Sequence, residues 1–282
     1  LFRSIKLNRS RLTDKIRDLY GDDLAKEYIR QLECHELYKH DETSIFPYCV
    51  AITMYPMLLD GLKNMGGISA PPKHLRSFCG IFVNMVFTIA AQFAGAVATP
   101  EFLLYFDYFC RKEWGNDYYL HYDKIVETSV SKERTIKDVI LDYFQNIVYY
   151  LNQPAAARNF QSVFWNISYF DSFYFKGVFG EFYFPDGTAP QWESLDALQR
   201  LFMKWFNKER TREVLTFPVE TMNILWDPET KEYKDQEMAD FTAEMWAEGH
   251  SFFLYNSDSA DALSSCCRLK NKIESNVFSY TL

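Results

Sequence analysis

The chain has 282 residues, of which 48% are hydrophobic and 18% aromatic, enough to build the core of one large domain or two small ones. Its net charge of -8 argues against a nucleic-acid backbone or an anionic membrane surface as the main partner. The six cysteines include no CxxC pair and no secretion signal precedes them, which predicts reduced thiols in the cytoplasm.

The first quarter of the chain predicts a helical lead-in followed by a short strand. Residues 3–37 carry dense charge at helical spacing, with a break at Gly21, so a helical segment is expected over residues 1–37. The apolar run 45–52, which contains Cys49, predicts a buried strand. A helix is expected over 54–62 and a loop over 63–73.

Residues 77–100 contain no charged side chain, and the run is long enough to suggest a transmembrane helix. Asn84 and Gln92 lie within it, however, and no second apolar span would shield them. A strand and a helix buried inside an α/β domain are therefore favoured over a membrane span.

The remaining elements alternate in type. Helices are predicted over 101–114, 129–151, 194–208 and 235–249, and strands over 164–169, 214–225 and 250–255. Strands that alternate with helices indicate an α/β fold with parallel strands, whose functional residues gather at strand ends and in loops.

Adjacent cysteines at 266 and 267 are the most unusual feature of the sequence. Cys266 and Cys267 follow two serines and precede Arg268, which places them in a loop. A disulfide between neighbours would force the peptide bond between them away from trans, which leaves packing or thiol chemistry as their role. If they meet Cys49 in space, the three thiols suit a radical or disulfide-exchange site. Cys34, Cys79 and Cys110 are expected only to pack.

Two other polar clusters have simpler interpretations. His40-Asp41 could be an acid–base pair or metal ligands, but a turn is favoured. Asp240, Glu244 and Glu248 share one helical face, and a solvated acidic face is favoured over a cation site. No metal site is predicted, and no phosphate-binding glycine loop or dinucleotide fingerprint occurs.

Four stretches, in order, resemble the anaerobic, class III ribonucleoside-triphosphate reductases, which are glycyl radical enzymes. The resemblance runs from about Leu37 to the chain end and implies that residues 38–282 form the central part of a ten-stranded catalytic α/β barrel, whose finger loop carries the cysteine doublet. The stretches are Tyr38-Lys39-His40-Asp41 with Cys49, Gln161-Ser162-Val163-Phe164-Trp165-Asn166-Ile167, Leu215-Thr216-Phe217-Pro218-Val219-Glu220-Thr221-Met222 and Ser265-Cys266-Cys267-Arg268-Leu269.

The resemblance also implies roles for the cysteines. One of Cys266 and Cys267 would be the transient thiyl radical that takes the 3′ hydrogen of a ribonucleoside triphosphate. Cys267 is favoured because in the related pyruvate formate-lyases the second cysteine of a doublet exchanges with the glycyl radical. Cys49 would protonate the departing 2′ hydroxyl and supply reducing hydrogen. The product would be the 2′-deoxyribonucleotide, made under anaerobic conditions for DNA replication.

The family further implies a set of cofactors and partners. A glycyl radical is installed by an activating enzyme that uses S-adenosylmethionine and an iron-sulfur cluster, and the reductant is formate or a dithiol protein. Nucleotide effectors, an ATP-binding regulatory domain and a homodimer are also implied. No glycine follows Cys267, and the cysteine-rich zinc module of the family is missing from the sequence. We therefore expect a piece of a longer protein that does not turn over alone.

Two alternatives stay open at this point. Another glycyl radical enzyme, related to pyruvate formate-lyase, would also use adjacent cysteines. A non-catalytic binding or membrane protein would use its cysteines only for packing. The early Cys49 and the Arg268-Leu269 pair after the doublet favour the reductase.

Overall fold

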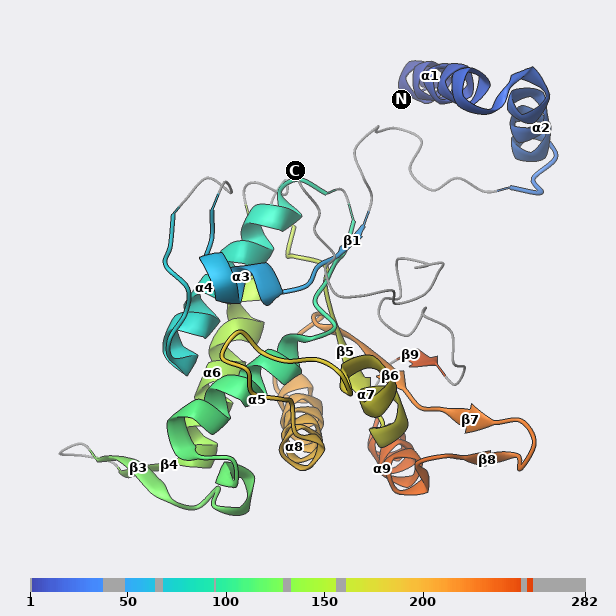
Figure 1. The fold of residues 1–282 in the computed structure, drawn as a ribbon. Helices are drawn as coiled ribbons and strands as arrows, with labels where there is room; N and C mark the ends of the chain where they lie inside the picture. The colour runs from blue at the N-terminus through green and yellow to red at the C-terminus, as the bar shows by residue number, and fades with distance from the viewer. Residues whose placement is uncertain are drawn as a thin grey trace. The chain divides into compact units, whose positions relative to one another are not determined.

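A computed structural model of the chain describes residues 2–37, 49–63, 68–93, 95–128, 133–155, 161–249 and 253–255 (Figure 1). The chain divides into two compact units, Leu1–Tyr48 and Cys49–Leu282. The predicted site residues Cys266 and Cys267 lie outside the described residues, as does the His40-Asp41 pair.

The first unit contains two helices, α1 (Phe2–Tyr20) and α2 (Asp22–Glu33), as predicted from the charge pattern. Gly21 between them has a φ of 92°, a conformation that glycine adopts without strain and that ends α1. Ala25 and Leu32 of α2 are buried, whereas Leu19 near the end of α1 is 62% exposed.

The second unit is built on a five-stranded sheet in which all neighbouring strands are parallel. The strand order β1-β2-β5-β6-β9 follows the order of these strands along the chain. The prediction of an α/β fold with parallel strands is confirmed, while the ten-stranded barrel stays a prediction. The strands are β1 (Val50–Ala51), β2 (Val97–Ala98), β5 (Trp165–Phe170), β6 (Val219–Asn223) and β9 (Phe253–Tyr255).

The connections between these strands carry helices, several of which pack together over one face of the sheet (Figure 1). The ring of Trp165 lies 5.7 Å from that of Phe82 and 5.3 Å from that of Phe102, and Phe144 lies 4.8 Å from Phe202. This core explains the high aromatic content. The helices are α3 (Tyr55–Asp60), α4 (Leu75–Ala90), α5 (Phe102–Trp114), α6 (Ile136–Asn152), α7 (Ser172–Phe179), α8 (Trp192–Arg210) and α9 (Gln236–Ala247), with a 3₁₀ turn, η1 (Tyr118–Leu120).

The uncharged run 77–100 divides into a helix and a strand, as predicted. It forms most of α4 and all of β2, and its apolar side chains, such as Phe78 and Val86, are buried in the core. Within the described part of the chain, no helix combines the length and apolar character needed to cross a membrane.

The helix predicted over 129–151 begins later than expected, at Ile136. Glu133–Thr135 form strand β4, which pairs antiparallel with β3 (Ile125–Thr128). Thr135 then caps α6, because its hydroxyl accepts a hydrogen bond from the backbone N–H of Asp138 at 3.2 Å. The pairing of β3 with β4 thus decides where α6 starts.

The strand predicted over 214–225 is shorter than expected. The Oδ1 of Asn152 accepts hydrogen bonds from the backbone N–H groups of Thr216 and Phe217, both at 3.1 Å, so these residues are held outside the sheet. The next bond, Phe217–Pro218, is cis, and β6 begins at Val219. A small hairpin follows, β7 (Trp226–Asp227) with β8 (Glu232–Tyr233), which the sequence did not predict.

A buried ion pair fastens α5 within the core. The Nε of Arg111 donates to Asp107 at 2.8 Å, and the hydroxyl of Tyr118 donates to the other carboxylate oxygen at 2.9 Å. Arg111 also donates to the carbonyl of Ala189 at 3.3 Å and lies over the ring of Phe184. This network therefore joins α5, η1 and the loop before α8.

Candidate active site

Cys49, which the sequence predicted inside a buried strand over 45–52, lies just before the first strand, because β1 covers only Val50–Ala51. It directly precedes β1, and its side chain is neither fully buried nor fully exposed. The backbone N–H of Ala96 donates a hydrogen bond to its Sγ at 3.3 Å, while the N–H of Val50 donates to the carbonyl of Ala96 at 2.9 Å. The thiol is thus oriented by the neighbouring strand, in a residue that is only partly buried.

The two faces of the sheet differ in chemistry. Trp165 and Tyr169 of β5 contact aromatic rings of α4, α5 and α8, so the odd-numbered positions of β5 face the helices. The even-numbered positions point to the opposite face, where Asn166 and Ser168 lie, and at the end of the strand the apolar Phe170, whose ring is 5.3 Å from that of Phe179 in α7. This alternation of apolar and polar residues is unusual for a strand of a parallel sheet, which commonly is apolar on both faces.

The register of the neighbouring strands extends this polar face. Ala51 is level with Ala98, Ala98 with Asn166, and Ser168 with Thr221. Continuing the alternation by two residues places Cys49 on the same face as Ala51. We call the residues Cys49, Ala51, Ala98, Asn166, Ser168, Thr221 and Asn223 the polar face; its members on β1 and β2, Ala51 and Ala98, have small side chains.

The polar members of this face were not predicted as site residues from the sequence. The signal was present in Trp165-Asn166-Ile167-Ser168-Tyr169, where apolar and polar residues alternate with period two. Asn166, Ser168 and Thr221 are all at least 97% buried. Buried polar side chains in a sheet are costly unless they meet polar partners, so they mark this face as a place for polar contacts.

A carboxylate lies at the carboxyl ends of the first two strands. The hydroxyl of Thr53 donates to the Oε2 of Glu101 at 2.8 Å, and the N–H of Met54 donates to the same oxygen at 3.3 Å. Burial raises the pKa of the Glu101 carboxyl above its usual range, against these two bonds, which lower it. Glu101 therefore links the ends of β1 and β2.

A second buried carboxylate lies on the helix-covered face. The hydroxyl of Tyr169 donates to the Oε1 of Glu220, and the guanidinium of Arg210 lies 3.8 Å from its Oε2. Burial and then the nearby charge of Glu220 raise the pKa of Tyr169 well above its usual value. Because Glu220 faces the helices, it stabilises the packing of β6 rather than contributing to the polar face.

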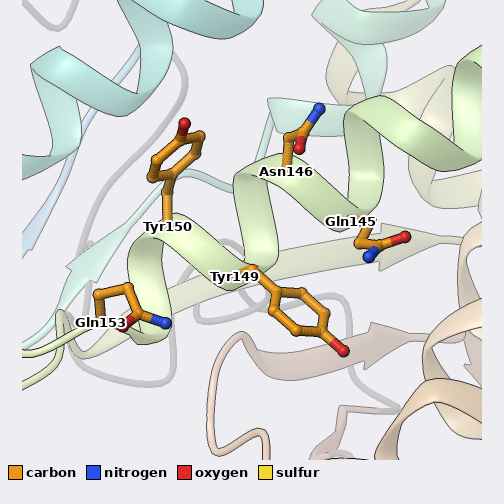
Figure 2. A pocket seen from close by; sticks show the side chains of 5 residues that line it. All are labelled: Gln145, Asn146, Tyr149, Tyr150 and Gln153. Carbon is orange, nitrogen blue, oxygen red and sulfur yellow. The ribbon is translucent and has the colours of Figure 1, made fainter.

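A shallow hollow of about 290 Å³ lies on the outer surface of α6, lined by Gln145, Asn146, Tyr149, Tyr150 and Gln153 (Figure 2). Its lining is made of amides and phenols and contains no thiol or carboxylate. The hydroxyl of Tyr149 donates to Glu209 at 2.9 Å, which ties this surface to α8. The hollow offers neutral hydrogen-bonding groups but no group suited to radical chemistry.

The other described cysteines and the acidic cluster singled out in the sequence lie outside the polar face. Cys79 and Cys110 are buried, as predicted, whereas the prediction that Cys34 packs is wrong, because it is exposed at the end of α2. Asp240 and Glu244 are exposed on α9, and Glu248, the residue that follows the helix, is exposed as well. Among the described residues, no group of three or more His, Cys, Asp or Glu side chains is arranged to hold a metal ion.

Comparison with known proteins identifies the family. A family model described as anaerobic ribonucleoside-triphosphate reductase matches residues 2–281. No curated protein matches. The match leaves the formate-lyase relative and the non-catalytic protein without support.

Solved structures agree with this match. The anaerobic ribonucleotide reductase of Thermotoga maritima, solved with citrate in its active site, is 28% identical, with a TM-score of 0.72 over 93% of this chain and 45% of that one. The same enzyme in complex with dATP and CTP is 28% identical, with a TM-score of 0.73 over 94% of this chain and 42% of that one. The chain thus spans less than half the length of these relatives. It belongs to the anaerobic ribonucleoside-triphosphate reductase family.

Proposed function

We propose that this chain is part of the catalytic domain of an enzyme that reduces ribonucleoside triphosphates to 2′-deoxyribonucleoside triphosphates. The observation that carries the proposal is the position of Cys49. Its thiol belongs to a residue that is only partly buried, is oriented by the N–H of Ala96, and lies at the edge of a face made of small and polar side chains. The solved relatives, which are anaerobic ribonucleotide reductases, support the same reaction for the complete protein.

The chemistry assigned to Cys49 is donation of a proton to the leaving 2′ oxygen and, once the reductant has restored the thiol, of hydrogen to the 2′ carbon. Loss of the 2′ hydroxyl requires a proton on the leaving oxygen, which a thiol within hydrogen-bond reach can provide. After donation the sulfur is a thiolate, and the N–H of Ala96, 3.3 Å away, stabilises that charged form.

The cysteine doublet supplies the second part of the proposal. We assign the thiyl radical to one of Cys266 and Cys267, with Cys267 favoured, although both lie outside the described residues. A glycyl radical, installed by an activating enzyme that uses S-adenosylmethionine and an iron-sulfur cluster, supplies the unpaired electron in this family. The partly exposed thiol of Cys49 and its small neighbours Ala51 and Ala98 fit a site that such a radical reaches through a second thiol.

The proposal extends to the architecture, reductant and effectors of the complete protein. We propose that the five parallel strands are part of a ten-stranded barrel and that the complete protein is a cytoplasmic homodimer serving DNA replication, with formate or a dithiol protein as reductant. The Thermotoga maritima enzyme was solved with dATP bound in its specificity site. A second structure of that enzyme is a complex with dATP and CTP. By analogy we propose nucleotide effectors here, and ATP binding by a regulatory domain of the complete protein.

The test uses the complete protein, activated anaerobically and supplied with a ribonucleoside triphosphate and either formate or a dithiol protein. We expect a 2′-deoxyribonucleotide product that disappears when activation is omitted. Product formation that persists in a variant lacking both Cys266 and Cys267 would refute the thiyl assignment. Absence of any deoxyribonucleotide from the activated protein would refute the function itself.

A further inference from the structure

A row of three residues crosses β1, β2 and β5 at the ends where these strands begin. The strands are in register at Ala51, Ala98 and Asn166. Since side chains alternate between the two faces of a sheet, the residues two positions earlier share one face and form the row Cys49, Ala96 and Phe164. The hydrogen bond from the N–H of Ala96 to the Sγ of Cys49 shows that the cysteine side chain leans toward β2. An aromatic side chain therefore lies two strands from the thiol, on the same face of the sheet.

Along this row, the residue between the thiol and the ring of Phe164 is Ala96. Neighbouring strands lie about 4.8 Å apart, so the Cα atoms of Cys49 and Phe164 are roughly 10 Å apart. Ala96 is fully buried and its side chain is a single methyl group. Sulfur is attracted to the edge of an aromatic ring at about 5 Å. With the thiol leaning toward β2, the spacing suits a contact between its sulfur and the ring of Phe164.

A second ring supports the ring of Phe164. The two centroids, of Phe164 and Phe217, lie 5.0 Å apart, and the planes meet at 88°. Edge-to-face geometry of this kind is a favourable arrangement of two aromatic rings. Phe217 is 9% exposed, whereas Phe164 is half-buried. The buried ring thus holds the ring that lies nearer to Cys49.

One side chain of α6 fixes the backbone of Phe217. The Oδ1 of Asn152 accepts hydrogen bonds from the N–H groups of Thr216 and Phe217, both at 3.1 Å. Its Nδ2 donates to the carbonyl of Phe217 at 2.7 Å and to the carbonyl of Val148, within α6, at 2.8 Å. Phe217 is therefore fastened to the end of α6 on both sides of its Cα, before the chain enters β6.

We propose that Phe164 is a positioning residue for Cys49, and that Asn152 acts on the thiol through Phe217 and Phe164. The ring of Phe164 restricts the directions open to the Sγ and excludes water from the side of the thiol that faces β5. This assignment rests on the proposed function, in which the thiol must donate to one oxygen of the substrate and therefore needs a fixed direction. The ring acts on the thiol and does not contact the substrate.

The test measures how fast iodoacetamide alkylates Cys49 in the complete protein without activation, with each cysteine quantified by peptide mass spectrometry. The rate is followed from about pH 7 to about pH 10, and its plateau, where the thiol is ionised, reports access rather than acidity. Cys34 is exposed and gives a reference rate. Cys79 and Cys110 are buried and report any general loosening of the fold.

The variants are a graded series, F164L, F164V and F164A, together with F217A, N152A and F164A/N152A. The plateau rate at Cys49 should rise as the side chain at position 164 becomes smaller. In F164A the rise should be about 2- to 10-fold, the range expected for loss of one contact between sulfur and an aromatic ring. F217A and N152A should give a smaller rise. F164A/N152A should match F164A, because the effect of Asn152 passes through the ring.

The matched control is F175A. Phe175 is also half-buried and pairs with another ring, that of Trp192 at 5.4 Å, so its loss should leave the Cys49 rate unchanged. In the activated enzyme, F164A should lower kcat and leave KM within about twofold, because the ring orients the thiol without binding the substrate.

An unchanged Cys49 rate across the series at position 164 would overturn the assignment, as would a rise that is equalled at Cys79 and Cys110. A raised KM with unchanged kcat in F164A would also overturn it. A rate in F164A/N152A above that of F164A would remove Asn152 from the route. If the activated protein makes no deoxyribonucleotide but the series still changes the Cys49 rate, the function fails and the positioning role stands. If the protein turns over and the rate does not respond, only the positioning role fails.

Discussion

The backbone N–H of Ala96 donates a hydrogen bond to the Sγ of Cys49 at 3.3 Å. This contact joins the entrance of β1 to the residue before β2, so the orientation of the thiol is set by the pairing of two parallel strands. A side chain oriented by the backbone of a neighbouring strand keeps its direction without help from a loop. The candidate proton donor is therefore part of the scaffold.

Replacement of Cys49 by alanine in the complete enzyme should lower turnover at least about 100-fold, because a positioned proton donor commonly contributes this much. The matched control is Cys34→Ala, since Cys34 is exposed at the end of α2 and should be dispensable. Deoxyribonucleotide formation measures the effect. A Cys49→Ala enzyme that retains more than about a tenth of the activity would contradict the role assigned to this thiol.

The two members of the cysteine doublet should behave differently. Cys267→Ser should abolish deoxyribonucleotide formation after activation, because a hydroxyl hydrogen is bound far more strongly than a thiol hydrogen and the radical cannot move to it. Cys266→Ser should keep activity if Cys267 alone carries the thiyl. Product analysis of both variants under identical activation decides, and the reverse result would move the assignment to Cys266.

The ion pair between Asp107 and Arg111 should be essential for stability. Asp107→Ala leaves the guanidinium, whose side chain is only 5% exposed, without its carboxylate partner, and should cost about 3–5 kcal/mol of unfolding free energy. Asp60→Ala is the control, because its pair with Lys63 is exposed and should be worth less than about 1 kcal/mol. Urea unfolding measures both. Equal losses of unfolding free energy in the two variants would mean that burial does not determine how much an ion pair stabilises this protein.

Glu101 should make the stability of the protein depend on pH. Burial raises the folded-state pKa of this carboxyl above its usual value of 4.5, so the folded protein keeps a proton that the unfolded chain has lost. Unfolding stability should therefore fall as pH rises from 4.5 through the raised pKa, since the folded state binds more protons in that window.

Glu101→Gln has no such proton and should flatten this dependence, gaining stability over the unsubstituted protein on the alkaline side. Urea midpoints measured between about pH 5 and about pH 8 test the difference. Glu181→Gln is the control, because Glu181 is exposed and should leave the slope unchanged. An identical slope in Glu101→Gln would show that another group carries the pH dependence.

The sequence predicted the elements that local pattern determines. The break at Gly21, the helix over 101–114 and the strand containing Trp165 all follow from spacing of apolar residues within a short window, and each is present. The late start of α6 and the shortened β6 were not predictable in this way. They depend on the pairing of β3 with β4 and on Asn152, which is 64 residues from Thr216.

The same distinction applies to the candidate site. Cys49 was found through its place in a motif and in an apolar run. Ser168 and Thr221 were missed because each is an ordinary residue in its own strand, and only the parallel register between β5 and β6 brings them together. Partners in a parallel sheet are separated by a whole crossover connection, so no local pattern can reveal them.

Glu220 and Thr221 point to opposite faces of the sheet, and this alternation limits which deletions β6 can tolerate. Deleting one codon within β6 would shift every later residue of the strand to the opposite side, turning Thr221 toward the helices and Met222 toward Ser168. A deletion of two codons would restore the sides but shorten the ladder. Insertions and deletions in this region should therefore be tolerated only in the β7–β8 hairpin. There the chain has left the five-stranded sheet, so a change of length does not move side chains from one face of that sheet to the other.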